Sequence, residues 1–174
     1  PVVHVSTDEV YGALTGNLES WDENEPLKPN SPYSASKASS DLIALSFYKT
    51  YGMDIRVTRC CNNFGIGQHA EKLLPKSILS AINDKEISIY GDGKNVREWI
   101  HAEDHAEGII LVSEKGKSGE VYNIGSGEEI SNNEIAKMIA RYTGTSAEIK
   151  YITDRPGHDY RYALNFNKIK NYAA

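Results

Sequence analysis

Two short stretches of the sequence carry side chains that can give or take a proton, and the first is a pair of adjacent carboxylates. Asp8 and Glu9 follow an apolar run over residues 1–5. Such a run is typical of a buried parallel strand, and open α/β sheets bind ligands at the carboxyl ends of their strands. Adjacent strand residues point to opposite faces, so both carboxylates reach one pocket only if a turn begins here, which Gly12 favours. The alternative interpretation is an exposed loop start.

The second stretch pairs a phenol with an ammonium. Ser31 suits a helix N-cap and Pro32 the first helical position, which predicts a helix over residues 32–51. Tyr33 and Lys37 then lie one turn apart on one face. A free phenol has a pKa of about 10, and a nearby ammonium lowers it. The pair can therefore accept a proton from a hydroxyl, although the same spacing also occurs on solvated helix faces.

These stretches belong to a series of motifs that spans nearly the whole chain. In order, they are Ser-Thr-Asp-Glu-Val-Tyr-Gly (6–12), Ser-Pro-Tyr-Ser-Ala-Ser-Lys-Ala (31–38), Asn-Asn-Phe-Gly (62–65), Glu-Lys-Leu-Leu-Pro (71–75), Ile-Tyr-Gly-Asp-Gly (89–93), Arg-Glu-Trp (97–99), Glu-Asp-His-Ala (103–106), Tyr-Asn-Ile-Gly (122–125) and Asp-Arg-Pro-Gly-His-Asp (154–159). The series resembles the extended short-chain dehydrogenase/reductase family that acts on nucleotide sugars. Thr7-Asp8-Glu9 is similar to the signature of its dTDP-glucose 4,6-dehydratase branch.

The resemblance implies an α/β fold, formed by the C-terminal part of a doubly wound Rossmann-like parallel sheet and a smaller mixed α/β substrate-binding subdomain. Residues 1–64 would be the end of the dinucleotide-binding domain, with the catalytic residues. Residues 65–174 would mainly bind the nucleotide sugar, with some return to the sheet. No Gly-x-Gly-x-x-Gly follows a strand in this sequence. We therefore expect a fragment of a longer enzyme that lacks the N-terminal NAD-binding half and is inactive alone.

The reaction that the resemblance implies is an NAD-dependent dehydration of dTDP-glucose to a 4-keto-6-deoxy sugar. It proceeds by transient oxidation at carbon 4, elimination of water and return of the hydride to carbon 6. Tyr33, helped by Lys37, would take the 4-hydroxyl proton, and Thr7 would hydrogen-bond to the 4-oxygen. Glu9 would remove the proton beside the ketone, and Asp8 would protonate the departing 6-hydroxyl. Two carboxyls with opposite tasks need different protonation states, which burial and closeness can supply.

Two other functions stay open. The first is another NAD-dependent nucleotide-sugar enzyme, an epimerase or a decarboxylase. Relatives of those types tend to lack the Asp-Glu pair, so Asp8 is the discriminating residue. The second is a non-catalytic module that binds a nucleotide sugar or mediates dimerisation.

The resemblance also assigns binding residues. Tyr33, Lys37 and Asn63 would lie against NAD. The residues assigned to the nucleotide sugar are Asn62, Lys72, Leu73, Tyr90, Arg97, Asn132, Arg155 and His158. Of these, Arg97 and Arg155 would hold the diphosphate, because a guanidinium can donate two parallel hydrogen bonds. From the residues alone, the two asparagines equally fit an Asx turn, and Arg97 fits a surface charge.

Composition limits the remaining partners. The net charge of −5 argues against binding to nucleic acid or a membrane surface, and no apolar stretch has the length of a membrane span. The neighbouring Cys60 and Cys61 indicate free thiols in a reducing cytoplasm. His101 and His105 have a metal-compatible spacing, but no motif supplies a third ligand, so no metal is expected.

The helix over residues 32–51 has a broad apolar face. In the family that it resembles, such a helix builds a four-helix bundle between two subunits. We therefore expect a homodimer through this helix in the full-length enzyme. Packing within one chain is the alternative.

Overall fold

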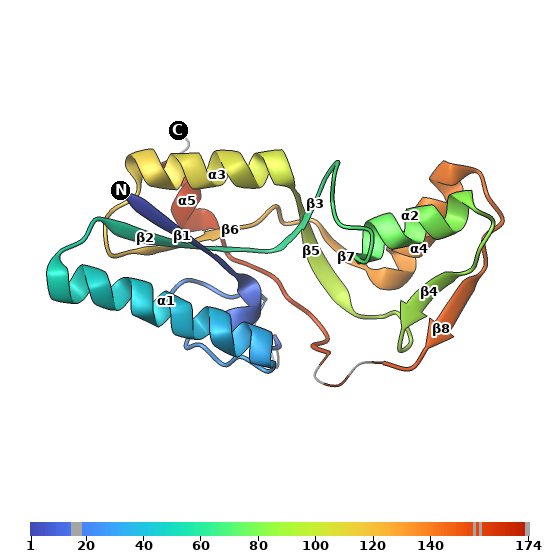
Figure 1. The fold of residues 1–174 in the computed structure, drawn as a ribbon, viewed down its shortest axis with the longest axis horizontal. Helices are drawn as coiled ribbons and strands as arrows, with labels where there is room; N and C mark the ends of the chain where they lie inside the picture. The colour runs from blue at the N-terminus through green and yellow to red at the C-terminus, as the bar shows by residue number, and fades with distance from the viewer. Residues whose placement is uncertain (15–18, 155, 157, 173–174) are drawn as a thin grey trace.

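The computed structural model describes residues 1–14, 19–154, 156 and 158–172. The chain divides between two parts that lie side by side, one around a parallel sheet and one around two further sheets (Figure 1). The elements of the first part are β1 (Val2–Thr7), η1 (Asp8–Tyr11), α1 (Pro32–Tyr51), β2 (Ile55–Cys60), α3 (Ala102–Lys115), β6 (Val121–Ile124) and α5 (Asn167–Lys170). Those of the second are β3 (Asn62–Phe64), α2 (Leu73–Ile82), β4 (Ile87–Tyr90), β5 (Val96–His101), β7 (Glu129–Ser131), α4 (Asn132–Thr143) and β8 (Ile149–Ile152).

The first sheet is parallel throughout, with strand order β1-β2-β6. Helix α1 covers one face and α3 the other (Figure 1). The predicted α/β class is therefore confirmed, and β6 lies in the first sheet although it follows most of the second part in sequence. The division into domains at residue 64 stays a prediction.

Helix α1 begins and ends where the sequence predicts. The Ser31 hydroxyl accepts a hydrogen bond from the Ser34 amide, the Ser34 hydroxyl accepts one from the Ser31 amide, and Pro32 opens the first turn. Gly52 ends the helix at φ 66°, a left-handed conformation that glycine adopts without strain. The start of the helix, which carries Tyr33, is thereby fixed.

The second part consists of small sheets. One sheet has the strand order β3-β5-β7, with β7 antiparallel to β5. The other pairs β4 with β8. Helix α4 begins at a capping box formed by Ser131 and Glu134. Helices α2 and α4 pack on each other at the far end of the molecule (Figure 1).

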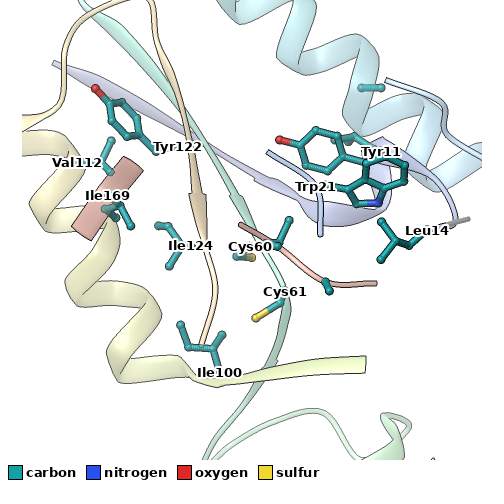
Figure 2. Packing of buried hydrophobic residues seen from close by; sticks show 14 residues of the cluster. Tyr11, Leu14, Trp21, Cys60, Cys61, Ile100, Val112, Tyr122, Ile124 and Ile169 are labelled. Atoms are coloured by element: carbon teal, nitrogen blue, oxygen red, sulfur yellow. The ribbon is translucent and has the colours of Figure 1, made fainter. Parts of the chain in front are cut away.

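Two apolar clusters hold these parts. The first lies between the parallel sheet and its helices and contains Val10, Tyr11, Trp21, Cys60 and Tyr122 among its members (Figure 2). The second lies under α2 and α4. Both cysteines are buried free thiols. Among the described residues, no helix has the length and apolar character that a membrane crossing requires, and no three potential ligands gather as a metal would need.

Candidate active site

The turn that the carboxylate pair requires is present at the end of β1. Thr7 caps the 3₁₀ helix η1, since its hydroxyl oxygen accepts from the Glu9 amide at 3.3 Å and donates to Asp8 Oδ1 at 3.1 Å. Gly12 ends the turn at φ 80°, where a Cβ atom would lie 2.2 Å from the Lys28 carbonyl oxygen. A side chain does not fit there, so the sequence of this turn is tightly constrained.

The two carboxyls of η1 lie in different environments. Asp8 is 1% exposed, whereas Glu9 is only partly buried. Burial, then the charge of Glu9, raises the pKa of Asp8 to about 7. An acid with such a pKa holds its proton near neutrality and can donate it. The pair therefore fits one proton donor and one proton acceptor.

The raised pKa of Asp8 makes the stability of the protein depend on pH. The folded state binds the Asp8 proton more tightly than the unfolded state, in which the pKa is near 3.8. The stabilisation is therefore complete below this value and is lost as the pH rises to about 7. The free energy of unfolding of wild type should therefore fall by about 2–3 kcal/mol relative to that of Asp8→Asn as the pH rises from 5 to 8, because each pKa unit corresponds to about 1.4 kcal/mol. Urea unfolding of both proteins measures this change.

Asp92→Asn is the matched control, because Asp92 is exposed and its backbone and side-chain hydrogen bonds with Lys94 lower its pKa. This variant should not gain stability at the higher pH. Equal pH slopes for wild type and Asp8→Asn would mean that Asp8 is ionised in the folded state throughout the range.

Helix α1 brings Tyr33 and Lys37 to the same edge of the sheet. Lys37 Nζ donates to the Val5 carbonyl at 2.8 Å, and the Tyr33 side chain is exposed. The expectation that Lys37 lowers the pKa of Tyr33 is wrong in this structure. Partial burial of the phenol, and then the charges of Glu9, Cys60 and Asp8, raise this pKa. Because the charges of Glu9 and Asp8 act on its phenol, Tyr33 lies near the carboxylate pair.

The two asparagines after β2 differ in their contacts. Asn63 Oδ1 accepts a hydrogen bond from His105 Nδ1 at 2.8 Å, and the Asn63 amide nitrogen donates to Cys61 O at 3.1 Å and to Cys60 Sγ at 3.3 Å. Its side chain is thus held by protein partners. Asn62 is half-buried in β3 and pairs in register with Trp99. Their roles toward cofactor and substrate stay predictions.

Arg97 is buried in β5 and lies near Asp8, whose pKa its charge lowers. Its guanidinium donates to the carbonyls of Asp159 at 2.7 Å and Tyr160 at 3.2 Å, and it lies over the Tyr162 ring. The structure therefore gives Arg97 contacts within the protein that an exposed surface charge would lack. Its contact with a diphosphate stays a prediction.

The other predicted substrate residues lie at element ends in the second part. Lys72 and Leu73 begin α2, Tyr90 ends β4, and Asn132 begins α4 with its amide bonded to the Asn95 carbonyl. His158 pairs with Asp154 at 2.7 Å. Arg155 lies outside the described residues.

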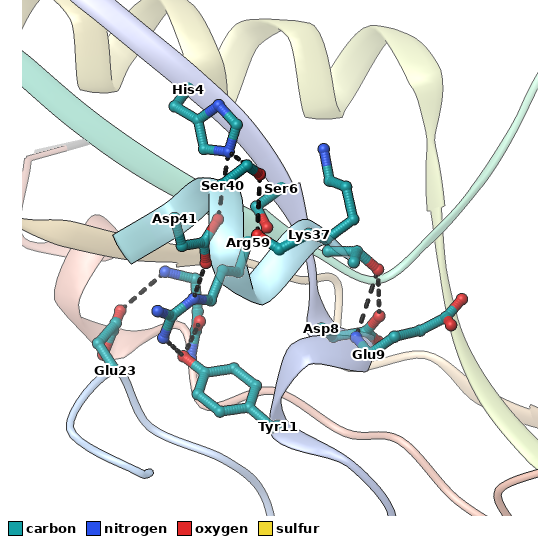
Figure 3. Close-up of polar contacts among 12 residues, drawn as sticks. His4, Ser6, Asp8, Glu9, Tyr11, Glu23, Lys37, Ser40, Asp41 and Arg59 are labelled. Carbon is teal, nitrogen blue, oxygen red and sulfur yellow. Dashed lines mark hydrogen bonds and ion pairs between the residues drawn. The ribbon is translucent and has the colours of Figure 1, made fainter. Parts of the chain in front are cut away.

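Sequence reasoning missed a buried carboxylate and a buried ion pair beside the site. Glu98 is 1% exposed, and its carboxylate accepts hydrogen bonds from the amides of Ser126, Gly127 and Leu164. Asp41 of α1 and Arg59 of β2 form a buried ion pair at 2.9 Å (Figure 3). The available signal was a charge on an otherwise apolar strand, since a buried charge requires a partner.

The sequence and the fold of this chain are similar to those of known proteins. Residues 1–125 match the NAD dependent epimerase/dehydratase family. A dTDP-glucose 4,6-dehydratase from Streptomyces griseus is 50% identical over 97% of this chain and 51% of its own length. A double mutant of the dTDP-glucose 4,6-dehydratase from Streptomyces venezuelae, solved with NAD bound, has a TM-score of 0.94 and 48% identity over 98% of this chain and 52% of its own.

More distant structures include enzymes of another reaction type. A UDP-N-acetylglucosamine 4-epimerase from Methanobrevibacter ruminantium has a TM-score of 0.90 and 29% identity, over 99% of this chain and 56% of its own. The fold is thus common to both reaction types, while the dehydratases share more of the sequence. The chain spans about half the length of these relatives.

Proposed function

The chain belongs to the NAD dependent epimerase/dehydratase family, and we infer from its site that the whole protein is a nucleotide-sugar 4,6-dehydratase acting on dTDP-glucose. The observation that carries this proposal is the pair of adjacent carboxyls at the end of β1, of which one is buried with a pKa of about 7. Elimination of water from a sugar ketone needs one base and one acid at neighbouring atoms, and Glu9 and Asp8 supply them.

The residues of the site divide the steps of the reaction between them in this proposal. Tyr33 accepts the proton of the sugar 4-hydroxyl, and the Lys37 ammonium, anchored on the Val5 carbonyl, lies one turn away on the same face of α1. Thr7 holds the 4-oxygen. Glu9 then takes the proton from carbon 5, and Asp8 protonates the 6-hydroxyl, which leaves as water. Finally Glu9 returns a proton to carbon 5. A protonated Asp8 also removes one of the negative charges that raise the pKa of Tyr33.

The cofactor in this proposal is NAD, which when bound accepts a hydride from carbon 4 and returns it to carbon 6. The donor set fits one end of it, since a phenol and an ammonium lie on one face of α1 beside the end of β1. Tyr33 and Lys37 would hold the ribose and nicotinamide there. The free cysteines support a reducing compartment, the cytoplasm.

Mass spectrometry of the reaction tests this function. The whole protein, incubated with NAD and dTDP-glucose, should yield a sugar nucleotide lighter by one water. If the mass is unchanged, proton NMR of the sugar nucleotide separates an inverted centre, which would indicate an epimerase, from unchanged substrate, which would favour a binding module.

We also propose that the whole protein is a homodimer through α1. Only Ser34, Ala38 and Asp41 are buried along this helix of 20 residues. Its large apolar side chains are exposed in one chain, namely Leu42 at 61%, Ile43 at 58%, Phe47 at 43% and Tyr51 at 70%. Monomeric proteins rarely leave so many apolar groups together in water, and a second copy offers the same helix face.

Phe47→Asp should convert this dimer into a monomer, because it places a charge in an apolar interface. Sedimentation velocity at about 1 μM measures the change. Tyr142→Asp, which adds the same charge at an exposed aromatic position of α4, is the control and should remain dimeric. A wild-type monomer, or a dimer that both variants retain, would contradict the interface.

A further inference from the structure

The two halves of the proposed chemistry lie on separate elements. Asp8 and Glu9 belong to η1, while Tyr33 and Lys37 belong to α1. These groups must act on adjacent atoms of one sugar, so the distance between the elements has to be fixed. The contact of Lys37 with Val5 joins α1 to β1, but it does not reach the far end of η1.

A buried chain of polar contacts joins that far end to α1 (Figure 3). Asp41 of α1 accepts from Arg59 Nε at 2.9 Å, and Arg59 Nη1 donates to the Tyr11 hydroxyl at 2.9 Å. Tyr11, the last residue of η1, donates in turn to Asn123 Oδ1 at 2.8 Å. Arg59 also lies over the Tyr11 ring, 4.8 Å from its centroid.

All four members are shielded from water. Asp41 and Asn123 are 0% exposed, Tyr11 is 1% and Arg59 is 4%. The Asn123 amide group is itself held, because it donates to the carbonyls of Trp21 at 2.9 Å and Asn165 at 3.1 Å. A displacement of Tyr11 would break both hydrogen bonds of its buried hydroxyl, those with Arg59 and Asn123, and an unpaired polar group is costly in such a setting.

We propose that Tyr11 is a positioning residue, whose hydroxyl, held between Arg59 and Asn123, fixes the turn of Asp8 and Glu9 against the helix of Tyr33. The proposal rests on the dehydratase function. Tyr11 itself touches no reacting atom. Tyr11 lies three residues after Asp8, at the end of η1. The hydrogen bonds of its hydroxyl in the core keep η1 at a fixed position relative to α1.

Tyr11→Phe removes the hydroxyl alone. The ring remains, with its stacking on Trp21 at 6.0 Å between centroids and its contact with Arg59. Tyr122→Phe is the matched control. Tyr122 is also fully buried, and its hydroxyl accepts from the Lys117 amide at 2.7 Å and donates to Glu120 at 3.3 Å. It lies beside Val112 and Ile169, away from Tyr11 (Figure 2).

Both variants of the whole protein should lower Tm to a similar extent, because each removes a buried hydroxyl. Only Tyr11→Phe should lower kcat for dTDP-glucose dehydration, by about tenfold to hundredfold, since small misplacements of catalytic groups have effects of this size. Its KM should stay within about twofold. Equal kcat values for wild type, Tyr11→Phe and Tyr122→Phe would overturn the proposal.

Arg59→Lys provides a second variant, because a lysine lacks the fork that holds Asp41 and Tyr11 together. If Arg59 acts through Tyr11, the double variant Tyr11→Phe/Arg59→Lys should have nearly the kcat of Arg59→Lys alone. Additive losses of kcat in the double variant would overturn this link. A wild-type protein without dehydratase activity would refute the proposed function. An active wild type whose kcat survives Tyr11→Phe would refute the positioning role alone.

Discussion

Tyr33→Phe should reduce dehydratase turnover of the whole protein by roughly 10²–10⁴-fold, the usual contribution of a positioned general base. The substitution removes the only atom of this side chain that can accept the 4-hydroxyl proton, and it leaves the ring. Since Tyr33 is 57% exposed, we expect stability to be nearly unchanged. Steady-state kinetics with dTDP-glucose measures the effect.

Tyr51→Phe is the matched control for this loss. Tyr51 lies on the same helix and is also exposed, at 70%, and its variant should keep wild-type turnover. A Tyr33→Phe enzyme within a few-fold of wild type would show that this phenol is part of a solvated helix face.

The second large effect concerns the carboxylate pair, whose two members should fail at different steps. Glu9→Gln removes the base, so neither product nor exchange of the carbon 5 hydrogen with D₂O is expected. Asp8→Asn removes the acid that the leaving 6-hydroxyl requires. Carbon 5 should still exchange, while product formation falls by roughly 10²–10⁴-fold. Proton NMR of the recovered sugar nucleotide distinguishes the two outcomes.

Glu103→Gln serves as the control, because Glu103 is an exposed carboxylate in the first turn of α3. It should change neither exchange nor turnover. If Asp8→Asn and Glu9→Gln both form product at the wild-type rate, the two residues are loop carboxylates and the dehydratase proposal fails.

Local sequence signals located the elements that carry the site. The Ser31-Pro32 start and the Gly52 end of α1 are short-range features, as is the capping box of α4, so the chain around them determines their conformation. Gly12, soon after the apolar run of β1, likewise favoured a turn at Asp8 over an exposed loop start. These features depend on neighbours within a few residues, which the sequence displays directly.

Long-range polar contacts could not be predicted in this way. Nothing near Asp41 or Arg59 in the sequence shows that the two meet across 18 positions, or that Arg59 reaches Tyr11. The pKa of Tyr33 was predicted with the wrong sign for the same reason. The nearby Lys37 is visible in the sequence, whereas burial and the approach of Glu9, Cys60 and Asp8 exist only in the fold.

A reaction of the wild-type whole protein in D₂O shows whether the carboxyls of η1 eliminate water from the sugar. The protein is incubated with NAD and dTDP-glucose, and the product is analysed by NMR. We predict a 4-keto-6-deoxy sugar with deuterium at carbon 5, because Glu9 exchanges its proton with solvent before it returns one. A product that retains its 6-hydroxyl and carries ordinary hydrogen at carbon 5 would contradict the account.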